Sequence, residues 1–240
     1  MISSEVFLKL PIRFNKYIRL YPPSVKEMVG EGGLGITYLS ILTNSKEEIV
    51  DYWQEQGLEG DPPNPWEYLT KAMEDENSML IVSSALYFFT KTEFTYIPKL
   101  GKFLIGNLKE EVESNKTLKD FRFFGEEEFF DFQNGVRKIC GLPEVERPDP
   151  DEDPRITRMK AKARYRDKVK ARSGKGTSLD LTLMAICCMG IGITPLNIGE
   201  VSYASINEIV RLYQQKESYE LNQKLLLAGA KNVSKKYWIR

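Results

Sequence analysis

The chain of 240 residues contains no histidine and only three cysteines. Histidine is the commonest general base, the commonest metal ligand and the side chain that titrates near neutral pH. Cys140 and the adjacent pair Cys187 and Cys188 lack the spacing of a zinc site, and their odd number does not favour a disulfide framework. We therefore predict a protein that is not an enzyme, with no catalytic residues, no metal site and no cofactor. The cysteines are interpreted as small buried side chains in a reducing compartment.

Long hydrophobic runs are also missing. The longest, residues 181–193, is broken by Thr182, Gly190 and Gly192, and it is shorter than the roughly 20 residues that a membrane-spanning helix needs. The N-terminus lacks a basic stretch followed by an apolar run, so it does not resemble a signal peptide. Lys plus Arg and Asp plus Glu number 34 each, so net charge attracts neither nucleic acid nor anionic membranes. We expect a soluble intracellular protein with no membrane partner.

The N-terminal part of the chain combines strand and helix signals. Alternating apolar and polar residues over 5–21 predict a β-hairpin. Ser24 followed by Glu27, and Ser45 followed by Glu48, have the spacing of capping boxes. Each of these pairs therefore predicts the start of a helix.

Two glycine-rich stretches resemble nucleotide-binding loops. Residues 30–35 satisfy the pattern G-x-G-x-x-G, but a dinucleotide site needs a strand before this pattern and a helix after it. The helix before these glycines is expected to run only through Val29, so we interpret them as a flexible turn between helices. Residues 173–178 lack the first glycine of a phosphate loop and are interpreted as a hinge and helix cap, although free N–H groups there would suit an anion.

The middle of the chain predicts three helices and a second hairpin. A loop over 57–65 precedes a helix that begins at Pro65, and another apolar helix is expected over 80–89. Residues 93–106 contain two β-prone pieces and predict a hairpin. A further helix is predicted over 125–140, with four core candidates: Phe129, Phe130, Val136 and Ile139.

An acidic, proline-rich stretch divides the chain. Residues 142–155 combine acidic side chains with prolines, which is typical of an extended linker. We therefore predict an N-terminal α+β domain over 1–141, this linker, and a helical C-terminal domain over 156–240. The fold class as a whole is α+β and mainly α-helical, with an N-terminal β-hairpin.

Two helices are predicted in the C-terminal domain. Thr177 and Asp180 predict the start of a helix that is apolar nearly all round, so we expect it to be central to the core. Ser205 and Glu208 predict the cap of the last helix. The apolar stripe of this helix contains Ile206, Ile209, Val210 and Tyr213.

Residues 155–175 are strongly basic, with ten Lys and Arg residues and one acidic residue, Asp167. Nucleic-acid binding would neutralise phosphates with such side chains. The candidate anion or nucleic-acid contacts are Arg158, Lys162, Arg166 and Lys175. The adjacent acidic run could instead pair with them, so a solvated helix beside a charged linker is the favoured interpretation and nucleic acid is the less favoured partner.

The chain ends on aromatic and apolar residues, where chain ends are usually polar and frayed. Two readings stay open: the end packs onto the core, or it is a recognition tail that presents an aromatic anchor. The predicted protein-binding residues are Tyr213, Tyr237, Trp238 and Ile239.

Three stretches resemble proteins encoded in the tail-gene clusters of phages that infect Gram-positive bacteria. Residues 19–49 contain PSVKEM followed by YLSIL, residues 126–142 read EEEFFDFQNGVRKICGL, and residues 201–230 resemble the last helix of those proteins, as KYWIR resembles their end. The resemblance implies a tail assembly chaperone or another tail morphogenesis factor. Its clients would be the tape-measure and tail-tube proteins, and its location the host cell cytoplasm or the virion.

Two other functions stay open at this stage: a structural virion component, and a nucleic-acid-binding protein that uses residues 155–175. Homo-oligomer formation also stays open. The absence of reactive side-chain clusters and the presence of charged and apolar segments favour protein–protein binding over catalysis.

Overall fold

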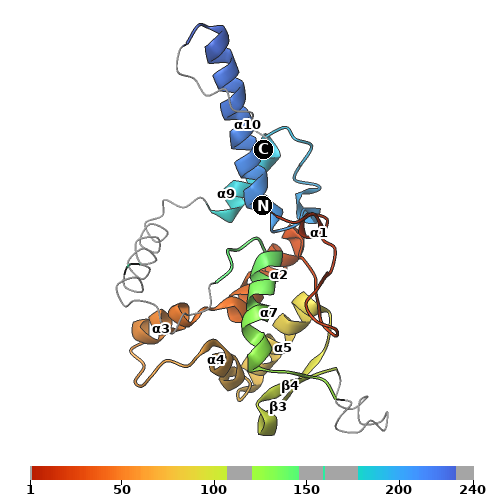
Figure 1. Ribbon diagram of the computed structural model, residues 1–240, viewed down its shortest axis with the longest axis vertical. Coiled ribbons are helices and arrows are strands. Elements are labelled where there is room, and N and C mark those ends of the chain that lie inside the picture. The colour runs from red at the N-terminus through yellow and green to blue at the C-terminus, as the bar shows by residue number, and fades with distance from the viewer. Residues whose placement is uncertain (1, 107–120, 146–158, 160–177, 231–240) are drawn as a thin grey trace. The chain divides into compact units, whose positions relative to one another are not determined.

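A computed structural model describes residues 2–106, 121–145, 159 and 178–230 (Figure 1). Helices dominate, and the strands form two small antiparallel sheets, which confirms the predicted mainly α-helical α+β class. The chain forms two compact units. The N-terminal unit comprises residues 1–144 and 199–205, and the C-terminal unit comprises residues 145–198 and 206–240.

Most of the predicted linker 142–155 lies outside the described residues, so the predicted three-part division stays a prediction. The described helices include none with the length and apolarity needed to cross a bilayer.

The N-terminal unit begins with a short helix and a hairpin. Helix α1 (Ser4–Phe7) is capped by Ser3, whose hydroxyl accepts a hydrogen bond from the N–H of Val6. The antiparallel strands β1 (Ile12–Arg13) and β2 (Arg19–Leu20) follow. The predicted hairpin is therefore confirmed, but it is shorter than predicted because the Ser3 cap makes the first residues helical.

Helix α2 (Val25–Thr43) begins at the predicted capping box and changes direction at its glycines. Gly32 and Gly33 have φ angles of 73° and 83°, in the left-handed region that favours glycine. A Cβ built on Gly35 would lie 2.6 Å from the Cα of Met28, whereas residues seven apart in a straight helix are separated by about 10 Å. The glycines turn the chain as predicted, but both sides belong to one helical element instead of two.

Three further helices match their predicted positions. The Ser45–Glu48 capping pair precedes α3 (Lys46–Glu55), as predicted. Pro65 is the first residue of α4 (Pro65–Ala72), as expected for a residue with no N–H to satisfy. Helix α5 (Glu76–Thr90) starts earlier than predicted because Asp75 caps it.

A three-stranded sheet follows in the order β3-β4-β5. The predicted hairpin is confirmed: β3 (Phe94–Ile97) pairs antiparallel with β4 (Lys102–Ile105), and the short 3-10 helix η1 (Pro98–Leu100) joins them. Strand β5 (Phe123–Phe124) pairs with the other edge of β4 and was not predicted.

Helix α7 (Glu126–Ile139) completes the core, in which α2 packs against both α5 and α7 (Figure 1). Phe124 is fully buried and its ring contacts five others: Trp66, Phe94, Phe103, Phe129 and Phe132. The predicted core residue Phe130 is only half-buried, and Phe132 takes its place. The buried face of α7 follows the spacing 129, 132, 136 and 139, so Phe130 points about 100° away from it.

In the C-terminal unit, α9 (Leu179–Cys188) is capped by Ser178, one residue later than predicted. The prediction that this helix is central to the core is wrong for the described residues, because Ile186 is its one buried residue. Met184 is 64% exposed. The 3-10 helix η3 (Ile198–Glu200) and helix α10 (Ser205–Leu227) follow.

Helix α10 begins at the predicted residue but without the predicted cap. The Ser205 hydroxyl is buried and forms no hydrogen bond within the described part of the chain. Glu208 instead accepts hydrogen bonds from the guanidinium of Arg211. In the predicted stripe, Ile206 is buried, and Ile209, Val210 and Tyr213 are half-buried.

Candidate functional site

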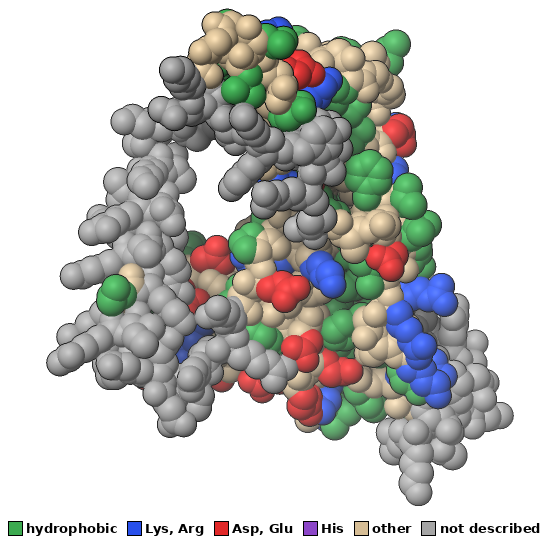
Figure 2. All heavy atoms as spheres, turned by 45° about the horizontal axis from the view of Figure 1, so that its top comes forward, with side chains coloured by type: hydrophobic (Ala, Val, Ile, Leu, Met, Phe, Trp, Pro, Cys, Tyr) green, Lys and Arg blue, Asp and Glu red, His purple; other side chains and the backbone are tan. Residues whose placement is uncertain are grey.

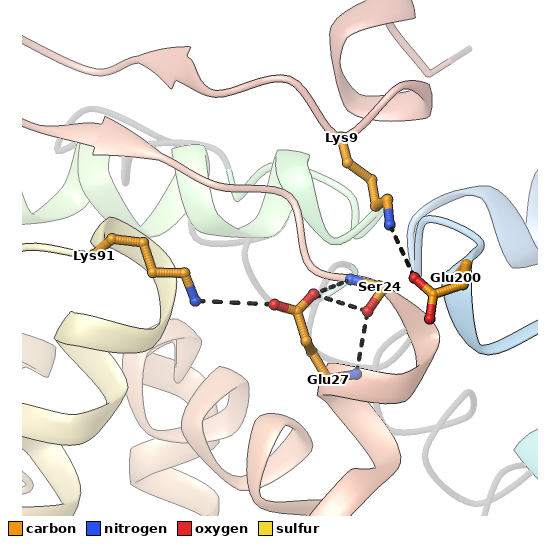
Figure 3. Close-up of polar contacts among 5 residues, drawn as sticks. All are labelled: Lys9, Ser24, Glu27, Lys91 and Glu200. Carbon is orange, nitrogen blue, oxygen red and sulfur yellow. Dashed lines mark hydrogen bonds and ion pairs between the residues drawn. The ribbon is translucent and has the colours of Figure 1, made fainter.

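A polar cluster of five residues from different parts of the chain lies at the start of α2: Lys9, Ser24, Glu27, Lys91 and Glu200 (Figure 3). The backbone N–H and the hydroxyl of Ser24 both donate to Oε2 of Glu27, at 2.7 and 2.8 Å, and the Glu27 N–H donates to the Ser24 hydroxyl at 3.2 Å. Lys91 Nζ lies 3.9 Å from Oε1 of the same carboxylate. Each Glu27 oxygen therefore has a partner, and the N-terminal turn of α2 is closed by its own side chains.

The same cluster holds residues 199–205 to the N-terminal unit. Lys9 Nζ lies 4.0 Å from Glu200 Oε2. The Val25 N–H donates a hydrogen bond to the Val201 carbonyl, and the Tyr203 N–H donates one to the Pro23 carbonyl, both at 2.9 Å. These contacts indicate a structural role, because every polar group described in them is used to join two chain segments.

Glu27 has a lowered pKa in this setting. Partial burial alone would raise the pKa, but the hydrogen bonds from Ser24 and the charges of Lys91 and Lys9 outweigh it and lower the pKa below the usual 4.5. A carboxylate whose pKa is lowered by folding stabilises the folded state fully at pH values above its unfolded-state pKa. This stabilisation is lost as the pH falls through the folded-state pKa.

Glu27→Gln should therefore lower the free energy of unfolding at pH 7 by about 0.3–1 kcal/mol, the usual range for an acidic side chain in the first turn of a helix. The difference from wild type should shrink as the pH falls below 4.5, because the wild-type carboxylate then becomes protonated. Urea unfolding at several pH values measures this. Glu59→Gln, in an exposed loop, is the control and should show no such pH-dependent difference. A Glu27→Gln difference that stays constant down to pH 3 would contradict the assignment.

Seven of the eight predicted binding residues lie outside the described residues: Arg158, Lys162, Arg166, Lys175, Tyr237, Trp238 and Ile239. Tyr213 is described and is half-buried on α10. Loss of hydration, a hydrogen bond to Glu217 and the charges of Glu217 and Glu220 raise the pKa of Tyr213. Its phenol therefore stays protonated at neutral pH and serves as a hydrogen-bond donor on this helix.

The cysteines differ from one another. Cys140 is buried as predicted, and burial raises the pKa of its thiol. Cys188 is exposed and Cys187 half-buried, so the prediction of a buried side chain is wrong for Cys188. All three are free, and the described residues include no group of three or more Cys, Asp or Glu side chains placed to share a metal ion.

The C-terminal unit exposes large apolar side chains on both of its described helices and on the segment between them. Leu196 is 97% exposed, and Leu227 is 89% exposed. The full set in the described residues of this unit is Met159, Leu181, Met184, Ile191, Leu196, Leu221, Leu225 and Leu227. Among the same described residues, the buried apolar side chains are Ile186 and Ile206. Figure 2 likewise shows apolar side chains at the surface beside charged ones at the upper end of the view.

Sequence reasoning missed this surface because it assigned the apolar residues of α9 to a core. The signal was available in part, since Leu221 and Leu225 continue the apolar positions of α10 among charged neighbours. Leu221 and Leu225 are four residues apart and therefore lie on the same face of the helix. Leu221 and Leu225 are both exposed, and adjoining exposed apolar side chains are typical of a surface that contacts another protein.

Comparison with known proteins gives no relative: no protein-family model, no curated protein and no solved structure matches the chain. These comparisons therefore assign no function to the chain.

Proposed function

We propose that the chain is a phage tail assembly chaperone or another tail morphogenesis factor, which acts by binding other tail proteins. Protein binding is supported by the exposed apolar side chains of the C-terminal unit. Among the described residues of this unit, eight large apolar side chains are exposed and two apolar side chains are buried. The phage assignment rests on the resemblance of residues 19–49, 126–142 and 201–230 to tail-cluster proteins.

The exposed leucines suit a helical client. Burial of one leucine side chain contributes about 1.5–3 kcal/mol, so two or three leucines in a client groove would supply a large part of a micromolar affinity. Charged pairs such as Glu208–Arg211 and Lys216–Glu220 lie on the same helix. Exposed charges of this kind direct orientation more than affinity. The tape-measure protein, which is long and rich in helix in such phages, is the proposed client.

Pull-down of the neighbouring tape-measure product with the intact chain tests this proposal. Leu221→Ser combined with Leu225→Ser should weaken binding at least tenfold, because each substitution removes apolar contact from the same helix face. Leu58→Ser is the matched control: Leu58 is 46% exposed but lies in the N-terminal unit, so its substitution should leave binding unchanged. Absence of binding at micromolar concentration, or equal binding by the double variant, would contradict the proposal.

Two alternative functions have separate tests. Recovery of the protein from purified phage particles would favour a structural virion component over a chaperone. Mobility shifts that vanish on charge reversal at Arg158, Lys162 and Arg166 would favour a nucleic-acid-binding protein, for which the ten basic residues of 155–175 are the supporting observation.

A further inference from the structure

The β1–β2 hairpin bears three exposed cations, and a fourth, Arg122, packs against the exposed aromatic ring at its tip. We call this group the basic hairpin patch: Arg13, Lys16, Tyr17, Arg19 and Arg122. The guanidinium carbon of Arg122 lies 4.0 Å from the ring centroid of Tyr17, and Lys16 Nζ lies 5.5 Å from the same centroid. The Tyr17 side chain is 40% exposed. The patch thus presents a stacked guanidinium–phenol pair together with three further positive charges.

Two of the cations face each other across the hairpin. Arg13 and Arg19 are register partners in the antiparallel pair, so their side chains leave the same face. The neighbouring pair, Ile12 and Leu20, points to the opposite face, where Leu20 is buried in the core. Like charges directly opposite each other are destabilising. The hairpin therefore bears an unfavourable repulsion that a bound anion would relieve.

The described residues provide no ion-pair partner for this patch. None of its four cations forms a salt bridge with a carboxylate of the described part of the chain. The Arg13 Nε donates to a backbone carbonyl, that of Asn15, at 3.1 Å. Glu128 of α7 lies beside the hairpin and accepts a hydrogen bond from the Asn15 amide at 3.2 Å.

The tip of the hairpin is fixed by hydrogen bonds. The Asn15 side-chain oxygen accepts from the N–H groups of Tyr17 and Ile18, both at 2.8 Å. The Phe14 N–H donates to the Ile18 carbonyl at 3.0 Å, and the Phe14 ring packs edge-on against Phe132 in the core. Tyr17 is consequently held outward on an ordered turn, and little conformational entropy would be lost when it contacts a ligand.

We propose that the basic hairpin patch binds single-stranded nucleic acid. Three of its four cations are arginines, whose planar fork of N–H donors matches a phosphate group better than the point charge of lysine. Bases stack on aromatic rings and on guanidinium planes, and Tyr17 and Arg122 offer both. An acidic peptide would use the charges but not the ring, so the exposed Tyr17 favours nucleic acid over a protein ligand. This surface belongs to the N-terminal unit and is separate from the leucines of the proposed function.

Fluorescence anisotropy of a labelled 15-residue oligothymidylate, titrated with the intact protein at several salt concentrations, tests this proposal. The variant Arg13→Gln, Lys16→Gln, Arg19→Gln removes three charges from the patch. For single strands, each phosphate contact contributes about −0.7 to the slope of log affinity against log salt concentration. Loss of three contacts should therefore make this slope shallower by about 2, and the affinity at 0.1 M salt should fall roughly 100-fold. Tyr17→Ala should weaken binding roughly tenfold through loss of stacking.

The matched control removes three charges elsewhere on the N-terminal unit: Lys46→Gln, Lys99→Gln and Lys138→Gln, all at exposed positions. It should bind like wild type. Circular dichroism melting of every variant checks that each one is folded. The proposal fails if both triple variants bind alike, or if binding is lost only on substitution of Arg158, Lys162 and Arg166. It also fails if polyglutamate or anionic lipid vesicles bind the patch as tightly as the oligonucleotide does.

Discussion

Phe124→Ala is expected to lower the free energy of unfolding of the N-terminal unit by about 3–5 kcal/mol, the usual cost of removing a fully buried phenylalanine. Phe124 is 0% exposed and its ring touches five other aromatic rings from α4, the three-stranded sheet and α7. The truncation would leave a cavity where these elements meet. Because the Trp66 ring lies 5.8 Å from that of Phe124, tryptophan fluorescence during urea unfolding would record the change.

Phe7→Ala is the control for this experiment. Phe7 is 58% exposed on α1, so the same chemical change should lower the free energy of unfolding by less than about 1 kcal/mol. Equal losses for the two variants would mean that the aromatic cluster does not form the core of the N-terminal unit.

Gly35→Ala is expected to destabilise the N-terminal unit by about 2–3 kcal/mol, at the upper end of the range for overpacking. A Cβ at this position would lie 2.6 Å from the Met28 Cα and 2.8 Å from the Glu27 carbonyl oxygen. Both are backbone atoms, which cannot move aside as the end of a flexible side chain can. The two parts of α2 would have to separate, and Met28 is fully buried in the core. Urea unfolding of the variant measures the loss.

Gly30→Ala is a matched control in the same helix. Apart from its chain neighbours and the nearby backbone of its own helix, no atom lies within 4 Å of the position that its Cβ would take, and its φ is not in the left-handed region. Since alanine favours helix over glycine by about 0.5–1 kcal/mol, this variant should be as stable as wild type or slightly more stable. A loss in Gly30→Ala as large as that in Gly35→Ala would show that the close approach at Gly35 is not what requires glycine.

The parts of the fold that could be predicted from the sequence depend on residues close together in the chain. The Ser24–Glu27 and Ser45–Glu48 pairs gave correct helix starts because a capping box needs only two side chains three residues apart. The position of α9 was predicted wrongly because an apolar pattern indicates that a helix favours burial, but does not indicate which residues would bury it.

The candidate sites were less predictable. The alternation of residues 5–21 predicted the hairpin, but neither the pairing of Arg13 with Arg19 nor the approach of Arg122 to Tyr17. That approach depends on residues more than 100 positions apart, and no local pattern encodes such a pairing. The exposure of Leu221 and Leu225 likewise depends on what packs against α10, so the sequence could predict an apolar stripe but not its accessibility.

The return of residues 199–205 to the N-terminal unit has a topological consequence. Backbone hydrogen bonds at Val201 and Tyr203 fasten this segment beside the start of α2, so residues 145–198 leave the N-terminal unit and come back to it. They form an insertion anchored at both ends. The entropy of closing such an insertion changes by only about 0.6 kcal/mol for each doubling of its length. The N-terminal fold can therefore accept a longer or shorter insertion at little cost in stability.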